Sequence, residues 1–131
     1  MKRTLFSLIL LAGIALSASA QPYRDYADSV INHLYQKKSW KQLQDQTHSL
    51  LERGIDSYNV RLKAGVAAFE LRKYRQAVTH LQKAWEVVPG DSLLNAFYYR
   101  ALKYSGREDE AALLADQISS DLRKAIQIQR K

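Results

Sequence analysis

The chain has 131 residues, a formal net charge of +7 and no cysteine. This length allows one small domain, and the lack of thiols excludes disulfides and any site that needs a cysteine ligand or nucleophile. The basic residues are spread along the chain instead of forming a dense stripe. We therefore expect no nucleic-acid partner.

Residues 1–20 have the pattern of a cleaved signal peptide. Lys2 and Arg3 form a basic start, an apolar run extends from Leu5 to Leu16, and Ala18–Ala20 has the small residues that signal peptidase accepts. An uncleaved anchor is the alternative, but a spanning helix needs about 20 apolar residues. The pattern predicts export, with cleavage between Ala20 and Gln21. The mature chain, residues 21–131, would then be soluble and carry a net charge of +5.

Apolar residues recur at three- and four-residue spacing through residues 21–131, which predicts six helices and no strand. Pro22 is expected in an extended lead-in, and Tyr26, Val30 and Leu34, together with Ala27, are expected on the apolar face of the first helix. The six helices are expected at about Tyr23–Lys37, Trp40–Arg53, Tyr58–Arg72, Tyr74–Val88, Ser92–Tyr104, and from Glu108 to Gln127 or Ile128.

Short polar segments separate these helices and predict their ends. Ser39, then Asp56 or Ser57, and finally Asp91 are expected to cap the helices that follow them. Gly54 is expected to end the second helix in a left-handed conformation, and Ser105–Arg107 is expected to form a tight turn around Gly106.

The sequence also repeats with a period of 34 residues, which is typical of stacked helical pairs. Trp40 is followed at this spacing by Tyr74 and Glu108, and Leu43 by Ala77 and Ala111. The period divides the chain into repeats at about 24–57, 58–91 and 92–128.

The middle repeat resembles a tetratricopeptide repeat (TPR). The pattern is carried by Gly65, Tyr74, Ala77, Leu81, Ala84 and Pro89, and Gly106 and Ala111 continue it in the third repeat. Small residues at 65 and 77 would let two helices of one repeat cross closely, while Ala84 would admit the next repeat and Pro89 would fix the turn. The outer repeats are degenerate, with Ile31 and Tyr99 at the glycine position. The resemblance implies an all-α solenoid of three helix-turn-helix repeats in residues 21–131.

A narrower resemblance concerns the segment "LRKYRQAVTHLQKAWEVVPGD" (71–91) and "YYRALKYSGREDEA" (98–111). It is similar to the periplasmic N-terminal TPR module that precedes the β-barrel of certain bacterial outer-membrane proteins. This resemblance implies a periplasmic, outer-membrane-associated location. It also implies an alternative role as a structural extension, or a truncated fragment, of an outer-membrane assembly.

No pattern in the sequence indicates an enzyme. His33, His48 and His80 are not paired at metal-binding spacing, and Glu108–Glu110 is the acidic first turn of a helix. No nucleophile elbow or glycine-rich phosphate loop is present. We therefore expect no catalytic residue, metal, cofactor or small-molecule substrate.

The first helix of each repeat should line a concave face that binds a protein or peptide partner. We expect this face to change from polar residues in the first repeat, through an apolar centre, to basic and aromatic residues in the third. Its candidate contact residues are Asn32, Tyr35, Asn59, Leu62, Val66, Phe69, Arg100, Lys103 and Tyr104. An alternative is that part of the apolar set belongs to the core. The end of the last helix, at Leu122, Ala125 and Ile126, forms a second candidate docking edge.

Overall fold

The computed structural model describes residues 21–129, except for the side chains of residues 122, 123 and 125–129. The predicted signal peptide and the apolar edge at 122–126 therefore lie outside what it describes. Residues 21–36 form the first helix, and the others are α2 (Trp40–Glu52), α3 (Tyr58–Glu70), α4 (Tyr74–Val87), α5 (Ser92–Tyr104) and α6 (Glu108–Gln129). Between residues 21 and 129 there is no strand, and no helix there is long and apolar enough to cross a membrane.

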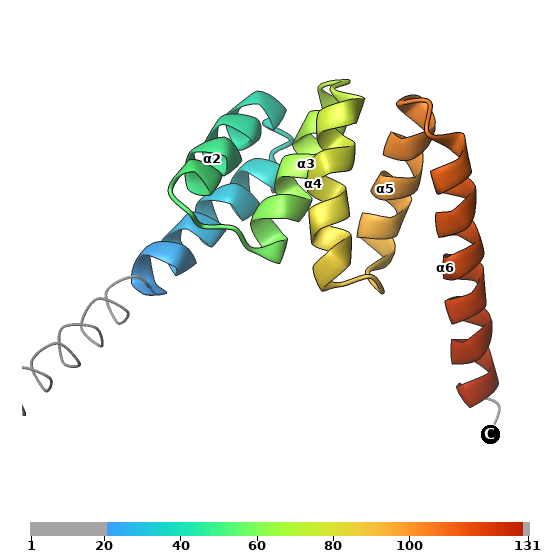
Figure 1. Cartoon of the computed structure of the whole chain (residues 1–131). Helices are drawn as coiled ribbons and strands as arrows, with labels where there is room; N and C mark the ends of the chain where they lie inside the picture. Colours follow the sequence, from blue (N-terminus) through green and yellow to red (C-terminus); the bar gives the residue numbers. More distant parts are fainter. Residues whose placement is uncertain (1–20, 130–131) are drawn as a thin grey trace, which may run out of the picture.

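The helices follow one another in chain order across the molecule, so that each pair lies beside the next (Figure 1). Residues 21–36, α3 and α5 are the first helices of the three pairs, and α2, α4 and α6 are the second helices. Most contacts join neighbours, α2 with α3, α3 with α4, α4 with α5, and α5 with α6, and a smaller contact joins the first helices α3 and α5. This arrangement confirms the predicted all-α repeat solenoid.

The turn inside each pair has the same backbone geometry in all three repeats. A left-handed residue recurs every 34 positions, at Lys38 (φ 55°), Arg72 (φ 62°) and Gly106 (φ 80°). In each turn two backbone N–H groups donate hydrogen bonds to carbonyls at the end of the first helix. The N–H groups of Lys38 and Ser39 bond Tyr35 and Leu34, those of Arg72 and Lys73 bond Phe69 and Ala68, and those of Gly106 and Arg107 bond Lys103 and Leu102. The left-handed residue ends α3 at Glu70, earlier than the Arg72 that its apolar pattern predicted.

The two segments that link the repeats differ in their hydrogen bonding. We call the segment between α2 and α3 the first joint and the segment between α4 and α5 the second joint. At the first joint Gly54 has φ 78°, and the N–H groups of Gly54 and Ile55 bond the carbonyls of Leu51 and Leu50 at 3.0 and 2.9 Å. Pro89 takes the place of Ile55 at the second joint and has no N–H to donate. That joint therefore lacks the second backbone bond.

Two of the three predicted helix caps are present. The Ser57 hydroxyl accepts a hydrogen bond from the N–H of Val60, and the Asp91 carboxylate accepts one from the N–H of Leu94. Ser39 stands before α2 but its side chain makes no capping bond, so that prediction is wrong. The Ser39 N–H and carbonyl are instead used by the backbone turn and the first helical bond.

The core follows the repeat signature. Ala77, Leu81 and Ala84 are completely buried, together with Val66 and Leu94 from the flanking first helices. Gly65 lies against Leu81, because a Cβ built on Gly65 would overlap the Leu81 side chain and lie 3.3 Å from its backbone nitrogen. The predicted close crossing of the two helices of this repeat is therefore confirmed, with Leu81 as the partner of Gly65.

The first helix differs from expectation in two respects. Pro22 lies within the helix at residues 21–36 and not in an extended lead-in, and the φ angle of proline is compatible with helical backbone. Tyr26, expected on the apolar face, is 68% exposed, whereas Ala27 and Ile31 are buried against α2 and α3 residues such as Leu50 and Val60. The buried stripe is thus rotated by one residue.

Candidate protein-binding surface

The first helices lie close enough together to form a continuous surface. Asn59 of α3 donates a hydrogen bond to Asp28 Oδ1 at 2.9 Å and a longer one, 3.3 Å, to Asn32 Oδ1. Further along, Phe69 of α3 meets Phe97 of α5 edge to face, with ring centroids 5.4 Å apart. We call this surface the first-helix face. Its solvent-accessible and half-buried members include Asp25, Asp28, Asn32, Tyr35, Gln36, Asn59, Lys63, Phe69, Glu70, Leu93, Ala96, Phe97, Arg100, Lys103 and Tyr104.

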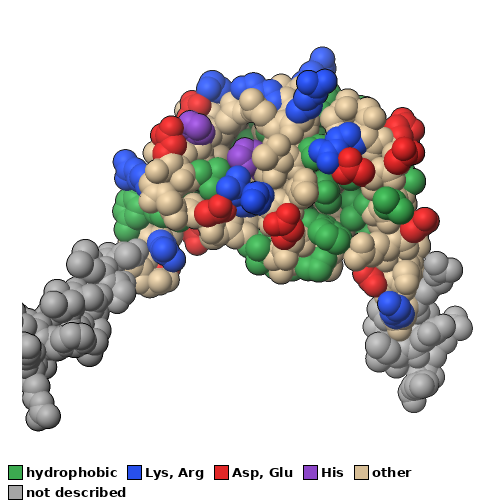
Figure 2. All heavy atoms as spheres, in the orientation of Figure 1, with side chains coloured by type: hydrophobic (Ala, Val, Ile, Leu, Met, Phe, Trp, Pro, Cys, Tyr) green, Lys and Arg blue, Asp and Glu red, His purple; other side chains and the backbone are tan. Residues whose placement is uncertain are grey.

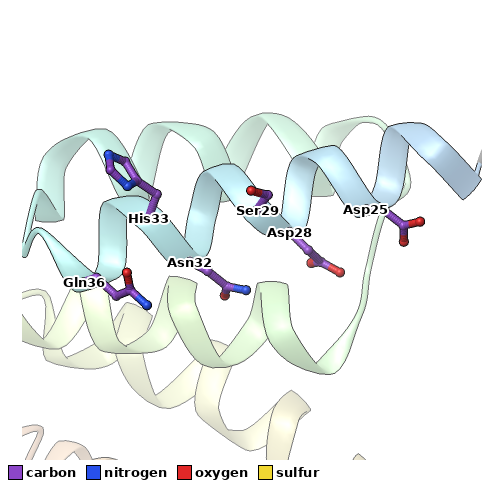
Figure 3. A pocket seen from close by; sticks show the side chains of 6 residues that line it. All are labelled: Asp25, Asp28, Ser29, Asn32, His33 and Gln36. Atoms are coloured by element: carbon purple, nitrogen blue, oxygen red, sulfur yellow. The ribbon is translucent and has the colours of Figure 1, made fainter.

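The N-terminal end of this face is polar. Asp25, Asp28, Asn32 and Gln36 project along one side of the first helix, as Figure 3 shows, and with Ser29 and His33 they surround a shallow hollow of about 550 Å³. One helix supplies all six lining residues because their spacing repeats every three or four positions. This end offers carboxylate and amide groups to a partner and little apolar area.

The middle of the face carries a cation and not the expected apolar centre. Leu62 and Val66 are only 5% and 0% exposed, so both belong to the core and cannot contact a partner. Lys63, the neighbour of Leu62, places its ammonium 4.2 Å from the centroid of the Tyr35 ring. Partial burial lowers the pKa of Lys63, against the opposing attraction of Asp91 and Asp28.

The C-terminal end of the face is aromatic and basic. The Phe69 ring packs against Tyr74, Phe97 and Tyr104, and the Tyr74 and Tyr104 rings stack with centroids 5.0 Å apart. The Arg100 guanidinium lies 5.1 Å from the Phe97 ring centroid and 5.7 Å from that of Phe69. Because Tyr104 is 62% exposed, this end combines accessible aromatic area with accessible positive charge.

Most of the predicted contact residues do lie on one surface. Asn32, Asn59 and Tyr35 belong to its polar and middle parts, while Phe69, Arg100, Lys103 and Tyr104 form its aromatic end, with Lys103 5.9 Å from the Tyr99 ring centroid. Sequence reasoning missed Lys63 and Phe97. Both occupy the same place in consecutive repeats and meet Tyr35 and Phe69, which are also 34 residues apart. This 34-residue spacing was the sequence signal from which Lys63 and Phe97 could have been assigned to the surface.

A separate cluster links α3 to α4. Arg61 holds Asp56 through two hydrogen bonds of 2.7 Å, from Nε to Oδ1 and from Nη2 to Oδ2, and its Nη1 lies 3.1 Å from Nδ1 of His80. An arginine can only donate, so Nδ1 accepts and His80 is held as the neutral ring. Burial, followed by the charge of Arg61, lowers the pKa of His80, while Asp56 opposes the shift.

Charged groups of both signs are interspersed over the side of the molecule that Figure 2 shows. Within the described residues, no group of three or more His, Asp or Glu side chains is placed to hold a metal ion. The acidic first turn of α6 is engaged locally, since Glu110 accepts two hydrogen bonds from Arg107. This bonding lowers the pKa of Glu110. The open first-helix face is therefore the leading candidate site.

Comparison of the chain with protein-family models and with curated proteins finds no match in either case.

Proposed function

We propose that this chain is an exported TPR-type module that binds a segment of another protein on its first-helix face. The proposal gains support from the 34-residue period, the glycine–leucine helix crossing and the identical turns, all of which are features of stacked helical repeats. Such arrays present a preformed surface, so that a partner segment binds without first ordering its receptor.

The observation that carries the proposal is the exposed aromatic and basic end of the face. Arg100, Lys103 and Tyr104 are exposed there, beside the half-buried rings of Phe69 and Phe97. Aromatic and arginine side chains supply much of the binding energy at protein interfaces. A segment with acidic side chains next to an apolar or aromatic residue matches this end in charge and shape.

The polar end restricts how such a segment would lie. Asp25 and Asp28 would repel acidic groups, whereas the carboxamides of Asn32 and Gln36 can bond the backbone of an extended or helical segment. The acidic part of the partner is therefore assigned to the α5 end. The face holds groups suited to binding, and the proposal includes no reaction and no cofactor.

Capture from a bacterial periplasmic extract tests this function. The double variant Arg100→Glu and Lys103→Glu should keep its circular dichroism spectrum, because both residues are exposed. It should recover less of the acidic partner than the unmodified protein. Capture by the unmodified protein should weaken as salt rises, since exposed charges are screened over about 10 Å at 0.1 M.

A charge-matched control distinguishes an effect of the first-helix face on capture from an effect of the net charge of the protein. Arg75→Glu combined with Lys83→Glu changes the total charge equally but lies on α4, where both side chains are exposed. The control should recover the partner as the unmodified protein does. Equal recovery by the unmodified protein and both double variants would rule out the first-helix face as the binding surface.

A further inference from the structure

An apolar cleft of about 720 Å³ lies between α5 and α6, at the C-terminal end of the solenoid. Its apolar lining comes from Ala96 and Tyr99 of α5 and from Ala115 and Ile118 of α6. Pro89, Gly90 and Asp121 also line it. Tyr99, Ala115 and Ile118 are all half-exposed. The cleft is thus open where the described repeats end.

The repeat symmetry shows what kind of element fits this cleft. Buried residues fill the equivalent places of Tyr99, Ala115 and Ile118 in the first and second repeats. These are Ile31, Thr47 and Leu50 in the first repeat, and Gly65, Leu81 and Ala84 in the second. Gly65 and Leu81 pack against each other inside the second repeat. Leu50 and Ala84, at the place of Ile118, are in the same core clusters as residues of the following first helix, Val60 of α3 in one case and Leu94 of α5 in the other. The α5–α6 cleft is therefore shaped to receive another first helix.

The N-terminal end of the molecule carries the complementary element. On α3, Val60 and Ala64 are buried at the joint with the first repeat, and the equivalent α5 residues are Leu94 and Tyr98, likewise buried. The corresponding places on the helix at residues 21–36 are Tyr26 and Val30. Tyr26 is 68% exposed and Val30 half-exposed, because no described repeat precedes them.

We propose that the chain associates head to tail, with the first helix of a second copy entering the α5–α6 cleft. Tyr26 and Val30 of the second copy would pack over Tyr99, Ala115 and Ile118. The joint between copies would then repeat the joints inside each copy. Such an interface uses two different surfaces of the same molecule, so it leaves one free end of each kind and builds rows of copies.

Two variants that each block one end provide the test. Tyr26→Glu places a charge on the exposed N-terminal face, and Ala115→Glu places one in the cleft. Sedimentation velocity over a range of concentrations should show that the unmodified protein grows into dimers and longer species. Each variant alone should remain monomeric with an unchanged circular dichroism spectrum. Their equimolar mixture should form dimers and nothing larger. Only the free cleft of the Tyr26→Glu variant and the free N-terminal face of the Ala115→Glu variant can still pair.

The control variant is Gln82→Glu, which adds the same charge at an exposed place on α4 and should associate like the unmodified protein. If Ala115→Glu fails to fold, Ser119→Glu replaces it, since Ser119 also lines the cleft, is exposed and lies outside the first-helix face. The proposal is overturned if the unmodified protein stays monomeric at its highest soluble concentration. It is also overturned if the mixture of the two blocked variants does not associate.

This inference stands apart from the proposed function. Neither Tyr26 nor Ala115 is a member of the first-helix face as defined above, so each single variant should leave partner capture unchanged. Loss of self-association with intact capture would therefore separate the two surfaces.

Discussion

The backbone of Gly65 and the side chain of Leu81 are in direct contact, with no room for even a methyl group between them. This contact sets how closely α3 approaches α4, and these two helices pack more extensively than any other pair among α2 to α6. Since both belong to the middle repeat, which touches both of its neighbours, their separation influences the position of the outer repeats as well.

Gly65→Ala should therefore destabilise the protein despite the higher helix propensity of alanine. Overpacking a core costs about 1–3 kcal/mol, while replacing a helical glycine gains about 1 kcal/mol, so a net loss of roughly 1 kcal/mol is expected. Urea unfolding gives the free energy of unfolding. Gly90→Ala is the matched control, because nothing lies within 4 Å of a Cβ built there. Equal losses in both variants would show that the helix crossing is not tight.

Arg72→Gly should stabilise the protein. Arg72 adopts φ 62°, in a turn whose equivalent in the third repeat is Gly106. A side chain in the left-handed region costs about 1 kcal/mol or more, and glycine removes most of that strain while losing some chain entropy. We expect a gain of about 0.5 kcal/mol in thermal or urea unfolding. Arg75→Gly, within α4, should instead lose up to about 1 kcal/mol. A loss at position 72 would contradict the assigned turn geometry.

The stability of the fold should fall as the pH drops from about 7 to about 5, in part because of His80. Its pKa in the folded protein is lowered below the ordinary value of 6.5 by burial and by Arg61. Between the two values the unfolded chain binds more protons, so protonation favours unfolding and stability rises with pH through this window. Asp56 opposes the shift and His48 adds to it.

His80→Gln tests this contribution because glutamine can still accept a hydrogen bond from Arg61 but cannot titrate. Urea unfolding near pH 7 and near pH 5 should show a smaller loss of stability in this variant than in the unmodified protein. His33→Gln, the same substitution at an exposed position, is the control variant. The same pH dependence in all three proteins would assign it to other groups.

Export should remove residues 1–20. The intact mass of protein recovered from a bacterial periplasm is expected to correspond to a chain that begins at Gln21. Ala20→Leu should block processing, because signal peptidase needs a small residue there, whereas Ser19→Leu occupies the tolerant middle position of the motif. Recovery of the unmodified protein with Met1 in the membrane fraction would contradict the prediction.

The sequence predicts a helix best where a capping residue marks its start and a glycine marks its end. The bounds of α5 agree with prediction because Asp91 caps its start and Gly106 ends its turn. The turns at Lys38 and Arg72 were less predictable, since neither residue favours the left-handed conformation that the repeat imposes. In these turns the tertiary packing of the helices decides the backbone geometry.

The candidate surface was only partly predictable for a related reason. Helical spacing placed Leu62, Val66 and Phe69 on one side of α3, but it could not show which of them the neighbouring helices cover. Leu62 and Val66 are buried, whereas Phe69 reaches the surface. At the N-terminal end, the buried Ala27 was expected on the apolar face, but Tyr26 was wrongly placed there and is exposed, while Ile31 was missed.

Pro89 at the second joint affects the order in which the repeats should separate under force. The first joint has backbone bonds from the N–H groups of Gly54 and Ile55. The second has one such bond, from the Val88 N–H to the Ala84 carbonyl, and a side-chain bond from Asn95 to the Pro89 carbonyl. Pulling on the two ends of the chain should therefore release α5 and α6 as one unit before the first two repeats separate. Arg100, Lys103 and Tyr104 would then move away from Phe69, so the proposed binding surface would be divided under mechanical tension.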